Sequence, residues 1–307
     1  MDKSSKIFVA GHGGMVGSAI CHQLENDGYY NIVVRSRREL DLTSQSKVSS
    51  FFNSEKPEYV FLAAAKVGGI KANSDMCGDF IYQNLMIQSN IIESSREYGV
   101  KKLLFLGSSC IYPKMCPQPI KEEYLLSGYL EPTNDAYSIA KIAGIKMCQS
   151  YNYQYGTNFI SVMPTNLYGG GDNYDPNTSH VLPALINKIH TAKINNTKFV
   201  EVWGTGDPMR EFLYVDDLAD ACIYLINNYD SSDIINVGSG IDISIRDLAS
   251  LIQDVIGYKC EMKFDISMPN GTPRKLLDVS KINNMGWFYK TDLKTGIELT
   301  YKKYLNE

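Results

Sequence analysis

Short apolar runs alternate with longer segments of helical periodicity along the first half of the chain. Buried strands are predicted at the apolar runs, over residues 6–10, 31–35, 59–65, 102–106 and 159–163. Apolar side chains recur at helical spacing over residues 15–25, 80–98 and 135–155. This alternation predicts an α/β protein with a doubly wound parallel sheet of the Rossmann type, covered by helices on both faces.

The pattern changes after Pro164. Three consecutive glycines at residues 169–171 break regular structure, and residues 172–179 are polar and loop-like. The next helix is predicted to begin near His180. This start places Pro183 in the first helical turn, where proline is tolerated.

Strand and helix patterns return over residues 212–227 and 234–237. We therefore expect one domain over residues 1–165, to which residues 212–238 return, and a smaller, discontinuous C-terminal domain within residues 166–307. The first is expected to bind a dinucleotide and the second a substrate.

The composition narrows the class of protein. The chain has 307 residues, of which 44% are apolar and 21% charged, as in an ordinary globular protein. Its net charge of −4 argues against nucleic acid or an anionic membrane as a partner. Neither a membrane-spanning run nor a signal peptide is evident, and seven cysteines without paired spacing favour free thiols, so we expect a cytoplasmic protein. No metal site is expected.

A glycine-rich segment joins the first predicted strand to the first predicted helix, and it reads Gly11-His12-Gly13-Gly14-Met15-Val16-Gly17. Glycines at the first, fourth and seventh positions let the backbone approach a pyrophosphate at a helix N-terminus, where free N–H groups favour anions. The spacing differs from G-x-G-x-x-G, and a plain turn is the alternative. Its position between a strand and a helix favours a dinucleotide site.

The residues after the second predicted strand favour NADP over NAD. An acid usually ends this strand in an NAD site, whereas here Arg35-Ser36-Arg37-Arg38 follows. Guanidinium groups suit a 2′-phosphate, and the alternative is a solvated basic turn. Asp41 is expected near the adenine edge.

Tyr137 and Lys141 lie four residues apart in a predicted helix, so they share one face. Reduction of a ketone leaves an oxygen that needs a proton, and a phenol can supply it. The ammonium of Lys141 is expected to lower the pKa of the Tyr137 phenol. Tyr98 and Lys102 have the same spacing at a predicted helix end, where the pair is expected to be structural.

Ser108 follows the predicted strand at residues 102–106, at the sheet edge where ligands bind. An extended chain there would point Ser108 and Cys110 to the same side. A serine in this place can hydrogen-bond a substrate oxygen. Serine, tyrosine and lysine together favour a catalytic site over a structural turn.

Eight segments spread over nearly the whole chain carry a resemblance to known proteins: GHGGMVGSAI (11–20), LAAAKVGGI (62–70), FLGSSCIYP (105–113), EPTNDAYSIAKIAGIK (131–146), MPTNLYG (163–169), SHVLPAL (179–185), VWGTGDPMREFLYVDD (202–217) and NGTPRKLLDV (270–279). In these segments the chain resembles the GDP-L-fucose synthase family of extended short-chain dehydrogenase/reductases. That family inverts two carbons flanking a ketone in GDP-4-keto-6-deoxy-D-mannose and then reduces the ketone with NADPH.

The resemblance implies catalytic roles. Cys110 would take a proton beside the ketone, and His180 would return one on the other face. Ser108, Tyr137 and Lys141 would serve the reduction, with Ser108 and Tyr137 also holding the developing enolate. Without the resemblance, a small buried cysteine and a structural histidine are equally good interpretations of Cys110 and His180.

The resemblance also implies binding residues and a homodimer, formed through the helices predicted at 80–98 and 135–155. The substrate would contact Lys188, Trp203, Arg210 and Asn270. The cofactor would contact residues 11–17, Arg37, Asp41, Leu42, Leu106, Gly107, Ser109, Lys141, Pro164, Asn166, Leu167 and His180.

Three places in the sequence depart from the family pattern. Gly13 stands where close members often carry an arginine for the NADP phosphate, although Arg37 remains. Gly170-Gly171 replaces a family segment that varies and often contains proline, and Asn270 replaces a frequent acid. These changes bear on the sugar and leave the class of reaction in place.

Two other functions compete with the epimerase/reductase. The nearer one is a C4-reductase of another GDP-4-keto sugar, such as a 6-deoxyheptose, with little epimerisation. The remoter one is a non-catalytic NADP sensor on the same scaffold. A 4,6-dehydratase is disfavoured, because no acid accompanies Ser108 at the strand end.

Overall fold

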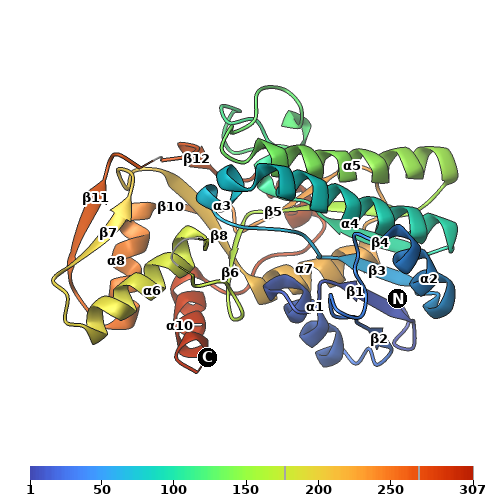
Figure 1. Cartoon of the computed structure of the whole chain (residues 1–307), viewed down its shortest axis with the longest axis horizontal. Coiled ribbons are helices and arrows are strands. Elements are labelled where there is room, and N and C mark those ends of the chain that lie inside the picture. The colour runs from blue at the N-terminus through green and yellow to red at the C-terminus, as the bar shows by residue number, and fades with distance from the viewer. Residues whose placement is uncertain (176–177, 269, 307) are drawn as a thin grey trace.

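The computed structural model describes residues 1–175, 178–268 and 270–306. Six strands form a parallel sheet in the order β2-β1-β3-β4-β5-β9 (Figure 1). Their bounds are Ile32–Val33 (β2), Ile7–Ala10 (β1), Tyr59–Leu62 (β3), Lys102–Leu106 (β4), Phe159–Pro164 (β5) and Ile235–Val237 (β9). The strands predicted from the five apolar runs are all present, although β2 and β3 are shorter than predicted.

Helices cover both faces of this sheet, as the alternating pattern predicted. Two of them pack together on one face, α1 (Met15–Asn26) and α7 (Val215–Asn228). The other face carries α2 (Gln45–Glu55), α4 (Cys77–Glu97) and α5 (Asp135–Tyr155), with α3 (Ile70–Asp75) leading into α4 (Figure 1). The doubly wound fold is therefore confirmed.

The order of the strands places a crevice beside β1. The chain leaves β1 through α1 toward β2 on one side, then returns through α2 to β3 on the other side. Ligands bind at such a switch point, outside the carboxyl ends of the strands. The glycine-rich turn follows β1 at this point, and residues 63–69 follow β3.

A second group of elements has a separate apolar core, on the left in Figure 1. Its central strand β8 (Met209–Tyr214) pairs with β6 (Asn166–Tyr168), β10 (Asp242–Ser244) and β12 (Arg274–Lys275). The other members are β7 (Phe199–Trp203), β11 (Glu261–Asp265), α6 (Val181–Ile194), α8 (Ile245–Ile256) and α10 (Leu293–Tyr304). We call this group the second unit, and the six-stranded sheet with its helices the first unit.

The chain crosses between the units several times. Residues 212–214 belong to β8 of the second unit, whereas α7 and β9 return to the first. After β12 the chain returns once more, because Leu277, Ile282 of α9 (Ser280–Asn284) and Trp287 are buried in the larger core. Within the described ranges, no helix is long and apolar enough to cross a bilayer.

Candidate active site

A cavity of about 1070 Å³ lies where the carboxyl ends of the parallel strands meet the second unit. It is lined by every residue that the sequence analysis assigned to catalysis or binding: residues 11–17, Arg37, Asp41, Leu42, residues 106–110, Tyr137, Lys141, Pro164, Asn166, Leu167, His180, Lys188, Trp203, Arg210 and Asn270. Segments far apart in the sequence therefore meet in one place. This shared cavity supports the assignment as a set; the role of each residue remains a prediction.

The glycine-rich turn has two glycines fixed by packing, at residues 11 and 17, and one beside open space, at residue 13. A Cβ on Gly11, whose φ is +94°, would lie 2.6 Å from the Ala64 nitrogen, and one on Gly17 would lie 2.1 Å from the Gly11 oxygen. Gly13 has nothing within 4 Å, and Gly14 caps the N-terminus of α1.

The same turn holds an unpaired polar atom. The Nδ1 atom of His12 is buried, and among the described residues it has no hydrogen-bond partner. Free space, an orphan ring nitrogen and a helix N-terminus together fit the pyrophosphate of a dinucleotide.

The three arginines after β2 have different surroundings. Arg35 forms an ion pair with Glu55 (2.5 Å), so its charge is already engaged. Arg35 and the exposed Arg37 both line the cavity, whereas the exposed Arg38 lies outside the lining, so Arg37 is the arginine of the lining whose charge is not engaged by an ion pair among the described residues. The expectation of three arginines around a phosphate therefore narrows to Arg37. Asp41 accepts hydrogen bonds from the Thr43 side chain and backbone, which lower its pKa.

Tyr137 and Lys141 lie one turn apart on α5, and both line the cavity. The Lys141 ammonium donates to the Leu106 carbonyl oxygen at 2.7 Å and lies 5.9 Å from the centre of the Tyr137 ring. Burial lowers the pKa of Lys141 to about 7. The Lys141 amine is therefore enclosed by protein, and it lies beside the carboxyl end of β4.

The expected lowering of the Tyr137 pKa by Lys141 does not hold in the protein alone. Burial raises the pKa of the phenol, the nearby Cys110 raises it further, and a hydrogen bond with Ser108 opposes them. Desolvation outweighs attraction here because both groups sit in a low-dielectric environment. The phenol consequently keeps its proton at neutral pH, the form that a proton donor requires.

Tyr98 and Lys102 share the spacing of Tyr137 and Lys141 but not their surroundings. The Tyr98 hydroxyl hydrogen-bonds Ser49 Oγ (2.8 Å), and Lys102 pairs with Asp230 (2.7 Å). Neither lines the cavity. The prediction that this pair is structural is confirmed.

The chain does not stay extended after Ser108, contrary to expectation. A short 3₁₀ turn at Ser109–Ile111 follows, and the Ser108 side chain caps it by accepting from the Cys110 N–H at 3.2 Å. A serine at the start of a turn satisfies a free N–H in this way. The turn nevertheless keeps Ser108 and Cys110 on the cavity wall.

Two donors reach the Cys110 sulfur. Asn134 Nδ2 and Lys275 Nζ each lie 3.4 Å from Sγ. Burial raises the pKa of the thiol, but the combined effects of Lys275, Ser108 and Arg210 outweigh burial and lower it. Lys275 was not singled out from the sequence, although it lies in the segment at 270–279 that carried the resemblance. The only hint was chemical, since a thiolate base needs a positive neighbour.

His180 occupies the N-cap position of α6, which begins at Val181, close to the predicted start. Its side chain is exposed and lines the cavity. Burial within the fold lowers the pKa of the imidazole, and the charge of Lys275 lowers it further. Cys110 and His180 therefore lie around the same ammonium.

The predicted substrate residues form the far wall of the cavity. Lys188 Nζ lies 5.8 Å from the centre of the Trp203 ring. The Arg210 guanidinium donates to the Asn270 carbonyl oxygen at 3.3 Å, and the Asn270 side chain accepts from the Thr205 N–H at 2.8 Å. A lysine, an arginine and an exposed indole suit a ligand with a diphosphate and a flat base.

All seven cysteines are free thiols. Across the described parts of the chain, there is no cluster of three or more His, Cys, Asp or Glu side chains that would suit a metal ion.

Comparisons with known proteins show the family to which the chain belongs. Residues 7–238 match the NAD dependent epimerase/dehydratase family. The chain is 57% identical to GDP-L-fucose synthase 1 of Arabidopsis thaliana over 304 residues, which covers 99% of this chain and 94% of the relative. It is 53% identical to GDP-L-fucose synthase of Escherichia coli (strain K12), covering 98% and 96%. The solved structure of MlghC, a GDP-mannoheptose C4 reductase from Campylobacter jejuni with NADP bound, is 44% identical, with a TM-score of 0.92 and 99% of each chain covered.

The different surroundings of the arginines give a prediction. Arg37→Ala should raise the dissociation constant for NADPH about tenfold to a hundredfold, because one charge-assisted phosphate contact is lost. The dissociation constant for NADH should stay unchanged, because NADH has no 2′-phosphate. Fluorescence titration of both nucleotides measures this. Arg38→Ala is the matched control and should behave as wild type; equal loss of both nucleotides in Arg37→Ala would contradict a role in phosphate selection.

Proposed function

Because the chain belongs to the NAD dependent epimerase/dehydratase family, we propose that it is an NADPH-dependent epimerase/reductase that converts GDP-4-keto-6-deoxy-D-mannose to GDP-L-fucose. The observation that carries the proposal is the meeting of two sets of groups in one cavity. Ser108, Tyr137 and Lys141 are a reducing set, and Cys110 and His180 are an epimerising pair. A simple reductase needs only the first set.

The residues suited to the cofactor surround the crevice beside β1. The turn at 11–17 would hold the pyrophosphate, Arg37 the 2′-phosphate, and Asn166 and Leu167 the nicotinamide side. NADPH, when bound, supplies the hydride for reduction of the ketone.

Epimerisation begins at Cys110. Its sulfur takes a proton from the carbon beside the ketone, and hydrogen bonds from Ser108 and Tyr137 stabilise the negative charge that forms on the ketone oxygen. His180 returns a proton on the opposite face. Its lowered pKa makes the imidazolium a ready donor, and the negative diphosphate of a bound substrate favours that protonated form.

Reduction uses the proton that Tyr137 retains. As charge develops on the ketone oxygen, the phenol donates this proton, while Ser108 hydrogen-bonds the same oxygen. Lys141 lies one turn away and stabilises the phenolate that is left. The substrate is held at its diphosphate by Arg210 and Lys188.

A C4-reductase of a GDP-4-keto heptose is the second candidate, which the likeness to the Campylobacter jejuni reductase favours. One extra carbon on the sugar is a matter of pocket shape. Higher identity to the two GDP-L-fucose synthases and the presence of both Cys110 and His180 favour the first candidate.

The assembly and location are part of the proposal. A homodimer through α4 and α5 is supported by large apolar side chains exposed on these helices, among them Tyr82, Ile139 and Tyr153. Sedimentation at the chain mass of 34.4 kDa would contradict it. Free thiols support action in the cytoplasm, which cell fractionation tests.

The direct test supplies GDP-4-keto-6-deoxy-D-mannose and NADPH in heavy water. We expect loss of NADPH absorbance, GDP-L-fucose as product, and deuterium at C3 and C5. A GDP-4-keto-6-deoxyheptose offered in parallel measures the second candidate. Faster reduction of the heptose without deuterium exchange would favour that candidate, and NADPH binding without any consumption would indicate a sensor.

Tyr137→Phe should lower the rate of ketone reduction by about 10²- to 10⁴-fold, because the proton donor is removed. NADPH affinity should stay close to wild type. The absorbance of NADPH measures the rate of reduction, and a binding titration measures the affinity for NADPH. Tyr98→Phe, which alters the structural pair of the same spacing, should leave the rate unchanged. Substantial turnover by Tyr137→Phe would refute the donor role.

Cys110→Ser should lower deuterium incorporation about 10²-fold, because a serine hydroxyl is a far weaker base than a thiolate. Reduction of a ketone that is already epimerised should persist. Mass spectrometry of the product and NADPH absorbance separate the two steps. Cys77→Ser, at an exposed thiol outside the cavity, is the control. Equal loss of both steps would mean that Cys110 is structural.

A further inference from the structure

A lysine of the second unit contacts the thiol of the first unit. Lys275 Nζ lies 3.4 Å from Cys110 Sγ, although 165 residues separate them in the sequence. Lys275 is the last residue of the short strand β12 and also lines the cavity. Such a contact forms only when the two units are docked.

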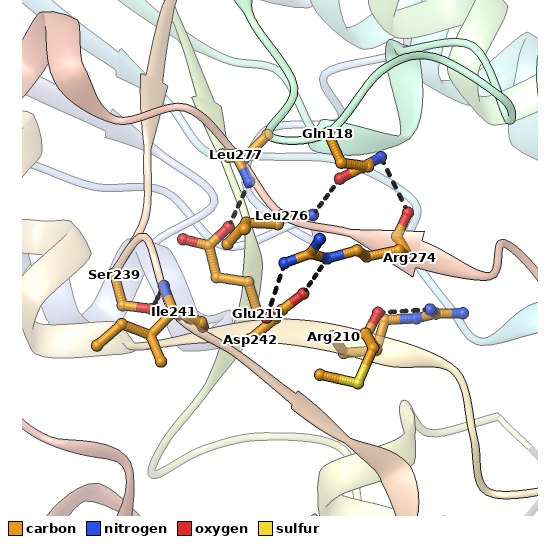
Figure 2. A network of polar contacts seen from close by, with 10 residues as sticks. Gln118, Arg210, Glu211, Ser239, Ile241, Asp242, Arg274, Leu276 and Leu277 are labelled. Atoms are coloured by element: carbon orange, nitrogen blue, oxygen red, sulfur yellow. Dashed lines mark hydrogen bonds and ion pairs between the residues drawn. The ribbon is translucent and has the colours of Figure 1, made fainter.

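The backbone on both sides of Lys275 is held by one side chain. Gln118 Nε2 donates to the Arg274 carbonyl oxygen at 3.1 Å, and Gln118 Oε1 accepts from the Leu276 N–H at 2.9 Å (Figure 2). Glu211 Oε2 accepts from the next N–H, that of Leu277, at 2.9 Å. The backbone at residues 274, 276 and 277, on both sides of Lys275, is thereby fixed by side-chain contacts.

Two further contacts fix the strand itself. β12 pairs with β8 in a register that sets Lys275 opposite Arg210. The Arg274 guanidinium forms an ion pair with Asp242 (2.6 Å) on β10 (Figure 2). β12 is therefore held by contacts with β8, with β10 and with the loop that carries Gln118. These contacts fix the backbone position from which the Lys275 side chain extends toward the sulfur.

We propose that Lys275 is a positioning residue for epimerisation, whose ammonium keeps the Cys110 sulfur in its thiolate form beside the substrate. This inference rests on the role proposed above for Cys110. When that sulfur takes the proton, the substrate C–H bond breaks, an S–H bond forms, and the electron pair moves onto the ketone oxygen. Lys275 keeps its own protons throughout and acts only through its charge.

Among the charged groups near Cys110, Lys275 has the largest effect in favour of the thiolate. Tyr137 interacts with the thiol from α5 and Arg210 from β8, and His180 lines the same cavity from the N-terminus of α6. Tyr137 is a neutral phenol, and Arg210 has a smaller effect on the thiol than Lys275. Glu131, the nearby acid, is engaged by Lys114 at 2.9 Å. Against burial, which alone favours the neutral thiol, the ammonium is the largest opposing influence.

The test measures the thiolate directly, without turnover. The rate of Cys110 alkylation by iodoacetamide is followed against pH by peptide mass spectrometry, with exposed Cys77 as the internal reference. Lys275→Met should raise the pH midpoint of Cys110 by about one to three units, since an opposite charge at this distance has that effect. Below the midpoint, each unit slows alkylation about tenfold. Lys275→Arg keeps the charge and should restore much of the wild-type profile.

A second readout uses the other group beside Lys275. The same ammonium lowers the pKa of His180, so Lys275→Met should also raise the titration midpoint of His180 in NMR spectra, where only four histidines are present. NADPH affinity close to wild type shows that the cavity is intact. Gln118→Leu, which frees the backbone around Lys275 but keeps the charge, should give a smaller rise in the Cys110 midpoint.

Two results would overturn the inference. One is an unchanged Cys110 midpoint in Lys275→Met; the other is a raised midpoint that Lys275→Arg does not lower. Failure of the proposed function gives a different result, in which the midpoints shift as expected while wild type neither consumes NADPH nor exchanges deuterium with the keto sugar.

Discussion

The common direction of the six strands is the constraint on which the rest of the site depends. Because all six are parallel, their carboxyl ends lie along one edge, and the turns after β1, β3, β4 and β5 open on the same side. That edge carries backbone N–H groups and polar side chains with no further strand to cover them. The second unit, built around β8, closes over it and turns an open edge into a cavity. Binding and chemistry are thus consequences of how the sheet ends.

Burial in the cavity shifts the pKa of each titratable side chain that lines it, and neighbouring charges shift the pKa further. Burial, together with the nearby Cys110, keeps the proton on Tyr137, which is the state that proton donation requires. Burial also lowers the pKa of Lys141 to about 7, so the ammonium is favoured when a negative phenolate forms beside it. A thiol under burial alone would also keep its proton, which does not suit a base. Cys110 therefore needs the charge that Lys275 brings. Burial thus suits the proposed proton donor, Tyr137, and hinders the proposed base, Cys110, and the charge of Lys275 offsets burial at the thiol.

Local features of this site were predictable from the sequence, whereas contacts between distant segments were not. The alternation of strands and helices predicted the sheet, and the spacing of Tyr137 and Lys141 predicted their shared face, because both depend on short-range periodicity. The 3₁₀ turn after Ser108 was missed, since a strand end carries no periodicity. Lys275 was missed for a different reason: its importance comes from a contact across 165 residues, and spacing along the chain holds no trace of it. The Arg35 ion pair with Glu55 was likewise invisible.

The origin of the groups separates the two reactions. Ser108, Tyr137 and Lys141 all come from β4, the turn after it and α5 within the first unit, so the reducing set is complete without the second unit. The proposed epimerising pair is different, because His180 caps the N-terminus of α6 and the positive charge beside Cys110 comes from Lys275 of β12, both in the second unit. Changes in the second unit can therefore alter epimerisation and sugar choice while the reducing set stays intact. With the roles proposed above, this division is consistent with the presence of both GDP-L-fucose synthases and a heptose C4 reductase among the relatives of this chain.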